Sequence, residues 1–197
     1  MRVAEKDEQK SACILQHETR IQLTGMTDPK MRAHCVVKTN AVRVLDRLGI
    51  KFELREYEVD PDDLSAETVA AKIGIPPEQL FKTLAVQGDR NGIYLAVISA
   101  NQELDFKALA HHTGDRKVDM LPLKEVQAAT GYIRGGVTAL ACKKDYAVYI
   151  DELAEICDVL SISAGRRGLQ VLLAPEDYVR AAKAKVVAIT KGKVNSH

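Results

Sequence analysis

The sequence lacks a long apolar run, and this absence excludes a membrane-spanning helix. No stretch approaches the roughly 20 apolar residues that cross a bilayer. The N-terminal residues MRVAEKDEQK are charged and lack the apolar core of a signal peptide. We therefore expect a protein of the cytoplasm with no membrane partner.

Cysteine and histidine are scarce and widely spaced. The four cysteines form no CxxC pair, which argues against a zinc knuckle and a redox dithiol. The five histidines also miss a metal-ligand spacing. His111 and His112 are adjacent, and neighbouring side chains on a helix point about 100° apart, so the two do not easily grip one ion. We expect no metal and no other cofactor.

Net charge is nearly absent. With 28 basic and 27 acidic residues, the formal charge is +1, so no strong overall field attracts nucleic acid or a membrane. One basic set near the C-terminus is either a solvated surface or a weak, salt-sensitive phosphate contact. Its members are Arg166, Arg167, Arg180, Lys183, Lys185, Lys191 and Lys193.

The common catalytic signatures are missing as well. There is no GxxxxGK[ST], no GxGxxG after a strand and no GxSxG. No serine or cysteine lies in a context that suggests activation by a histidine. If the protein is a hydrolase, its nucleophile is not an obvious side chain.

What is present fits one domain with a full apolar core. The chain has 197 residues, of which 46% are hydrophobic and 28% charged. Residues 1–35 show little periodicity, so we expect an N-terminal extension, flexible and outside the core, before an organised domain over 36–197. Helical and extended patterns alternate there without a regular βαβ period. This predicts an α+β fold with a mixed sheet.

Lys82 stands out within the apolar run Leu80–Leu84. A strand over 81–86 places Lys82 on one face with Leu84 and Val86. An ammonium group held against apolar walls is costly unless acceptors meet it, so Lys82 is a site candidate. The alternative is a strand that begins at Thr83, with Lys82 reaching water along its stem.

Two glycine-containing loops are further candidates. Gly135 and Gly136 would let the backbone approach a ligand and direct N–H groups at an anion or carbonyl oxygen, or would simply form a tight turn. In the second loop, Ser163 and Arg167 offer a hydroxyl and a planar fork of donors suited to phosphate or carboxylate. The alternative there is turn chemistry beside a surface arginine.

Together these stretches resemble the YbaK family of aminoacyl-tRNA deacylases, relatives of the editing insertion domain of bacterial prolyl-tRNA synthetase. The resemblance runs from about Thr39 to Lys191. Its motifs, in order, are Tyr57 at the end of the first strand, Phe81-Lys82-Thr83-Leu84, Leu104-Asp105, Thr130-Gly131-Tyr132 with Gly135-Gly136, Lys143-Lys144 and Ser163-x-Gly165-x-Arg167-Gly168-Leu169.

The resemblance implies a barrel-like mixed sheet with surrounding helices, and hydrolysis of the ester on the 3′-terminal adenosine of mischarged tRNA, best known in this family for Cys-tRNA(Pro). Lys82 would be the essential lysine. The pocket would be lined by Tyr57, Thr83, Gly135, Gly136, Ser163 and Arg167. An aminoacyl ester is already activated, so donors that stabilise the oxyanion could suffice. Prolyl-tRNA synthetase is the expected protein partner.

Two departures from the family pattern leave the amino acid open. The family loop commonly reads GxxxP, whereas the segment from Gly135 ends in Ala139, so the rigidity of proline is absent. Gln170 stands where close relatives carry an acidic residue. Alanine or another small residue is therefore an alternative to cysteine. The second reading of the whole chain is a module of the same fold that binds a nucleotide or amino acid without catalysis.

Overall fold

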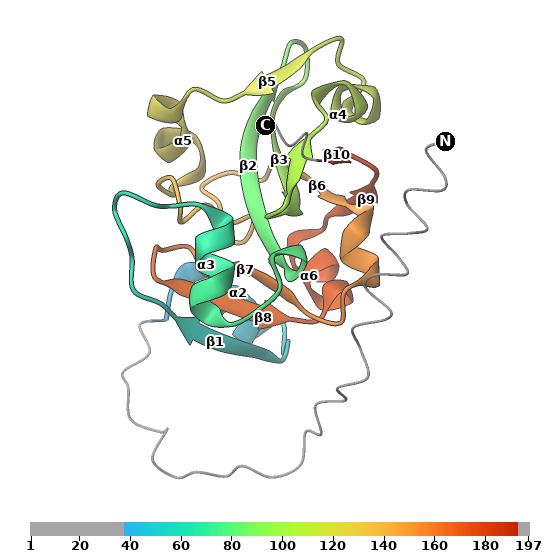
Figure 1. Cartoon of the computed structure of the whole chain (residues 1–197). Helices are drawn as coiled ribbons and strands as arrows, with labels where there is room; N and C mark the ends of the chain where they lie inside the picture. The colour runs from blue at the N-terminus through green and yellow to red at the C-terminus, as the bar shows by residue number, and fades with distance from the viewer. Residues whose placement is uncertain (1–37, 193–197) are drawn as a thin grey trace, which may run out of the picture. The chain divides into compact units, whose positions relative to one another are not determined.

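A computed structural model describes residues 38–192 of the chain (Figure 1). The predicted extension over 1–35 lies outside these residues. Five α-helices are described: α2 (Asn40–Arg47), α3 (Ala66–Ile73), α4 (Phe106–Thr113), α5 (Leu123–Thr130) and α6 (Pro175–Ala182). Two short 3₁₀-helices are η2 (Pro77–Gln79) and η3 (Glu152–Ile156). The strands are β1 (Phe52–Glu56), β2 (Leu80–Gly88), β3 (Gly92–Ser99), β4 (Gln102–Leu104), β5 (Val118–Met120), β6 (Ala147–Asp151), β7 (Leu160–Ser163), β8 (Leu169–Leu173), β9 (Lys185–Val187) and β10 (Thr190–Gly192).

A mixed eight-stranded sheet organises the domain, which confirms the predicted α+β class. Seven strands follow the order β1-β8-β7-β2-β3-β6-β9, and β5 pairs with β2 beside this path. The pairs β2–β7, β3–β6 and β6–β9 are parallel, whereas the other pairs are antiparallel. Strands β4 and β10 form a separate pair.

Local sequence explains most helix ends. Thr39, Ser65 and Asp105 cap α2, α3 and α4 by accepting hydrogen bonds from backbone N–H groups, as the capping pattern predicts. Gly74 and Gly114 end α3 and α4 in the left-handed conformation that glycine adopts without strain. Residues Glu152–Ile156 form the 3₁₀-helix η3, and β7 begins at Leu160.

The two faces of the sheet are buried by different helices. One face packs Phe81, Ala85 and the neighbouring strands against α2, α5 and α6. On the other face, Val86 packs with residues of α4, and Leu80 packs with α3. The alternation along β2 is as predicted, because Lys82, Leu84 and Val86 share this second face.

Strand β2 has an interrupted edge. Its whole length pairs with β3 on one side. On the other side it pairs with β7 at Leu80 and Phe81, and with β5 from Val86 to Gly88. Among the described residues no strand borders β2 between these two stretches. In Figure 1, β2 runs between β5 at one end and β7 at the other.

A buried carboxylate fixes the hairpin between β2 and β3. Asp115 is 8% exposed and accepts hydrogen bonds from the Tyr94 hydroxyl at 2.6 Å and from the N–H groups of Arg90 and Asn91 at 2.9 and 3.0 Å. Burial alone would raise the pKa of Asp115, but these bonds, with one from Thr113, lower it to about 2. Glycine is required at position 88, because a Cβ there would overlap the Asp115 carboxylate.

No described helix has both the length and the apolar character needed to cross a membrane.

We predict that Asp115→Asn lowers the free energy of unfolding by about 1–3 kcal/mol, because it removes charge-assisted hydrogen bonds from a buried site. The folded pKa lies below the unfolded value of about 3.9, so the contribution of the carboxylate is present above that value and is lost as the pH falls toward 2. Urea unfolding of both proteins between pH 7 and pH 3 measures this.

Asp119→Asn is the matched control, because Asp119 is exposed and forms only a surface ion pair with Lys117 at 2.7 Å. Equal losses in the two variants would contradict a special role for the Asp115 network.

Candidate active site

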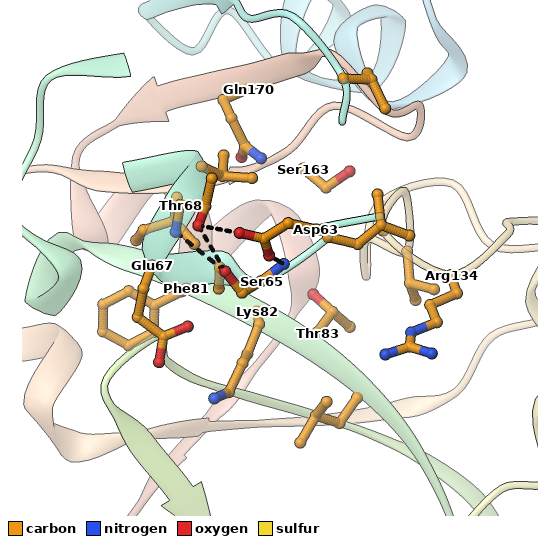
Figure 2. A pocket seen from close by; sticks show the side chains of 18 of the residues that line it. Asp63, Ser65, Glu67, Thr68, Phe81, Lys82, Thr83, Arg134, Ser163 and Gln170 are labelled. Carbon is orange, nitrogen blue, oxygen red and sulfur yellow. Dashed lines mark hydrogen bonds between the residues drawn. The ribbon is translucent and has the colours of Figure 1, made fainter. Parts of the chain in front are cut away.

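A cavity of about 710 Å³ lies along the interrupted edge of β2. Its walls come from α3 and the loop before it, from β2, from the segment that joins β5 to α5, from the loop after α5, and from β7 and β8. Figure 2 shows the labelled polar side chains of the cavity, among them Lys82, Thr83, Arg134, Ser163 and Gln170. Most of the remaining wall is apolar, including Phe81, Leu84, Leu121, Val126 and Val137.

Lys82 is half-buried and lines both this cavity and a smaller hollow that contains Gln102 and Glu103. Its ammonium group donates to the carbonyl oxygens of Ala100 at 3.0 Å and Gln102 at 2.8 Å. Burial lowers the pKa of Lys82 below its ordinary value, and the nearby Glu103 carboxylate opposes this shift. An ammonium group has three donors, so one remains beyond the two carbonyls. The alternative in which Lys82 merely extends into solvent is therefore wrong.

The structure brings four other predicted site residues to the same cavity. Tyr57, Thr83, Gly135 and Ser163 all line it. Gly135 adopts a φ of +82°, which suits glycine. These residues come from a loop, a strand, a second loop and a strand end that are far apart in sequence. Their convergence is consistent with the pocket that the motifs predict.

Gly136 and Arg167 do not line the cavity but contact the loops beside it. Arg167 donates from Nε to the Arg134 carbonyl oxygen at 2.8 Å. A Cβ at Gly136 would approach the Arg166 Cα to 3.2 Å, so the missing side chain lets the two loops pack closely. Both residues therefore support the loop that carries Gly135. Direct contact of either residue with substrate stays a prediction.

One acidic part of the wall did not follow from the sequence. The Asp63 carboxylate accepts hydrogen bonds from the Thr68 hydroxyl at 2.6 Å and the Ser65 N–H at 2.9 Å. The Thr68 bond is the largest of the causes that lower the pKa of Asp63 to about 2. Glu67 and Asp60 also line the cavity. The one sequence feature that could have indicated this acidic group is the position of Asp63 two residues before the helix cap Ser65.

Gln170 and Arg134 complete the polar lining. Gln170 is 5% exposed and accepts a long hydrogen bond of 3.5 Å from the Ser161 hydroxyl. A neutral amide thus stands at the position where an acidic residue was expected from the family pattern. Arg134 is exposed at the opposite loop.

The basic set proposed from sequence is partly neutralised, because Arg166, Arg180 and Lys191 form ion pairs with Glu56, Asp177 and Glu103.

The cavity offers electrostatic stabilisation and no evident protein nucleophile. Neither described cysteine, Cys142 nor Cys157, lines it, and burial raises the pKa of Cys142 to about 11, so this thiol is protonated near neutral pH. Within residues 38–192 no three His, Cys, Asp or Glu side chains are grouped so that they could hold a metal ion. The groups at hand are a lysine cation, backbone donors and hydroxyls. Such a site suits an ester that is already activated.

Comparisons with known proteins agree with this chemistry. The family model "Aminoacyl-tRNA editing domain" matches residues 60–181. The "Putative Cys-tRNA(Pro)/Cys-tRNA(Cys) deacylase EbsC" of Enterococcus faecalis is 42% identical over 78% of this chain and 93% of its own. The multifunctional Ser/Thr-tRNA deacylase ProXp-y of Escherichia coli K12 is 25% identical over 80% of this chain and 95% of its own. The crystal structure of hypothetical protein APE2540 shares the fold, with a TM-score of 0.71 at 22% identity over 78% of this chain and all of that one.

Fold, cavity and matches together define an aminoacyl-tRNA deacylase, a hydrolase that acts on mischarged tRNA. The chain belongs to the aminoacyl-tRNA editing domain family, the YbaK family.

We predict that Arg167→Ala lowers kcat/KM for deacylation roughly ten- to hundredfold. The loop that carries Gly135 loses the hydrogen bond from Arg167 to the Arg134 carbonyl oxygen, and small displacements at a reacting centre lower the rate strongly. Steady-state deacylation and thermal unfolding should be measured together. Arg180→Ala is the control, since Arg180 forms only an exposed ion pair with Asp177. Unchanged activity of Arg167→Ala would show that the loop holds its position without this bond.

Proposed function

We propose that this deacylase removes cysteine from Cys-tRNA(Pro) in trans. The observation that carries the proposal is the half-buried Lys82, which lines the cavity and whose ammonium group is fixed by two backbone carbonyls, in a chain 42% identical to EbsC. The site residues are Lys82 as the catalytic residue and Tyr57, Thr83, Gly135, Gly136, Ser163 and Arg167 as substrate-binding residues. Residues 36–197 form the editing domain in this proposal.

The fixed cation explains how the site can act without a protein nucleophile. The two carbonyls hold the Lys82 ammonium in place before the substrate arrives, so no reorganisation is needed when charge develops. In this proposal its remaining donor binds the substrate near the scissile ester. The attacking group is then water or, for a cysteinyl ester, the thiol of the substrate itself. The protonated Cys142 takes no part in this reaction.

The amino acid is the least constrained part of the proposal. The wall is mostly apolar, and such a wall discriminates poorly between side chains that differ by one small group. The relationship to ProXp-y, a Ser/Thr-tRNA deacylase, favours serine and threonine as further candidates. Alanine belongs in the same comparison. Cysteine is preferred here because the EbsC match is the stronger one.

We predict that the purified protein deacylates Cys-tRNA(Pro) with a higher kcat/KM than Ala-, Ser- or Thr-tRNA(Pro). Lys82→Ala should lower kcat/KM at least a hundredfold, because the positioned cation is lost. Lys82→Arg should not restore activity, since a planar guanidinium does not fit the hold made by the Ala100 and Gln102 carbonyls. Release of radiolabelled amino acid from each tRNA measures this.

Lys107→Ala is the control for loss of a lysine, because Lys107 lies on α4 and does not line the cavity. If wild-type protein deacylates none of the four tRNAs, or Lys82→Ala acts like wild type, the alternative of a non-catalytic module that binds a nucleotide or amino acid is favoured.

The protein is also proposed to work beside prolyl-tRNA synthetase in the cytoplasm. A formal charge of +1 offers little general attraction for tRNA, so a partner that already holds the tRNA would supply affinity. We expect the protein to be retained with prolyl-tRNA synthetase and tRNA(Pro) together at low salt, and much less with either alone. Co-purification on an immobilised synthetase tests this, with cysteinyl-tRNA synthetase as the control. Equal retention on both synthetases would contradict the partnership.

A further inference from the structure

The backbone of Thr83 is the part of β2 that the sheet leaves open. The Leu80 carbonyl accepts a hydrogen bond from the Ala100 N–H at 2.7 Å, directly after β3. Backbone groups alternate between the two edges of a strand, so the even-numbered residues of β2 bond toward β3. The odd-numbered residues therefore direct their N–H and C=O groups at the opposite, interrupted edge.

Thr83 differs from its odd-numbered neighbours on this edge. Phe81 pairs with Ile162 of β7. Ala85 accepts a hydrogen bond from the Leu121 N–H at 3.0 Å, and Gln87 pairs with Asp119 of β5. The pairing with β7 stops at Phe81 and does not continue to Thr83. Within the described part of the chain, no strand pairs with the outward backbone groups of Thr83.

This open position faces the cavity. Ser163 at the end of β7 and Met120, Leu121 and Pro122 at the end of β5 flank the gap, and all four line the cavity together with Thr83. Figure 2 labels Ser163 and Thr83 among the cavity residues. Backbone donors and acceptors away from bulk water need partners. The edge of β2 thus presents the N–H and the C=O of one residue, Thr83, to a ligand in the cavity.

The aminoacyl end of a charged tRNA carries the complementary pair. In an aminoacyl group, the ester carbonyl and the α-ammonium flank one α-carbon, just as the C=O and N–H groups do within one residue of a peptide. We propose that the aminoacyl group adds to the open edge of β2 as a one-residue antiparallel bridge, with the Thr83 N–H donating to the ester carbonyl oxygen and the Thr83 C=O accepting from the α-ammonium. This inference rests on the deacylase function proposed above and assigns the residue that binds the reacting carbonyl.

The bridge gives Thr83 a catalytic role through its backbone. When the nucleophile attacks, the electron pair of the carbonyl bond moves onto the oxygen to which the Thr83 N–H donates. When the intermediate collapses, the ribose oxygen leaves and takes the proton that the nucleophile gives up. A donor fixed in a sheet costs no reorganisation during these steps.

The bridge also sets which side chains fit. In a hydrogen-bonded antiparallel pair of L-residues, both side chains lie on the same face. The side chain of an L-aminoacyl group would therefore lie beside that of Thr83, on the face that carries Phe81 and Ala85. A D-aminoacyl side chain would be directed at the Lys82 face. The bridge thus predicts a preference for L-aminoacyl esters.

Thr83→Pro tests the donor directly. Proline removes the N–H, and at an unpaired edge position it breaks no sheet hydrogen bond. We expect Thr83→Pro to have a kcat/KM about a hundredfold below that of Thr83→Val, which loses the hydroxyl but keeps the N–H. Far-ultraviolet circular dichroism and thermal unfolding check that both variants fold. Equal activity of the two folded variants would overturn the proposal.

Amide hydrogen exchange provides a test that needs no variant. In the free protein, the Thr83 amide should exchange at least tenfold faster than those of Lys82 and Leu84, which bond toward β3. A saturating, non-hydrolysable adenosine with cysteine linked as a 3′-amide should slow exchange at Thr83 at least tenfold. Protection of Thr83 in the free protein, or no change with bound analogue, would refute the bridge.

Failure of the proposed deacylase function and failure of the proposed bridge give different results. A wild-type protein that deacylates no aminoacyl-tRNA refutes the proposed function, whatever the exchange rates. If the wild type is active but the exchange rate of its Thr83 amide does not change when the analogue binds, only the bridge is refuted.

Discussion

The site depends on a strand that has neighbours on both sides except over one short stretch. Strand β2 pairs with β3 throughout, yet β7 and β5 meet its other edge only at the ends. A sheet strand ordinarily satisfies its backbone groups with adjacent strands. Here the interruption leaves room for a cavity, while apolar clusters pack against β2 on both of its faces. The cavity is thus a product of the sheet topology.

The sequence predicted the features that depend on local chemistry. Capping by Thr39, Ser65 and Asp105 follows from residue type, and the alternation along β2 correctly placed Lys82. Strands β4, β5 and β10 were missed because three residues are too few to show a period of two. Missing β5 meant that the interrupted edge of β2 could not be seen in advance.

Contacts between distant segments were equally hidden. The packing of Gly136 against Arg166, and the bond from Arg167 to the Arg134 carbonyl, join two loops that are about thirty residues apart. The motifs predict Gly136 and Arg167 as site residues, but motif order alone does not distinguish a residue that lines a cavity from one that supports its wall. Only the positions in space separate Gly135 from its neighbour.

The half-buried thiol of Cys142 has a consequence for the behaviour of the protein toward oxidants. Peroxides oxidise the thiolate form of cysteine, and a pKa of about 11 leaves very little thiolate near neutral pH. Peroxides should therefore oxidise this residue only slowly near neutral pH.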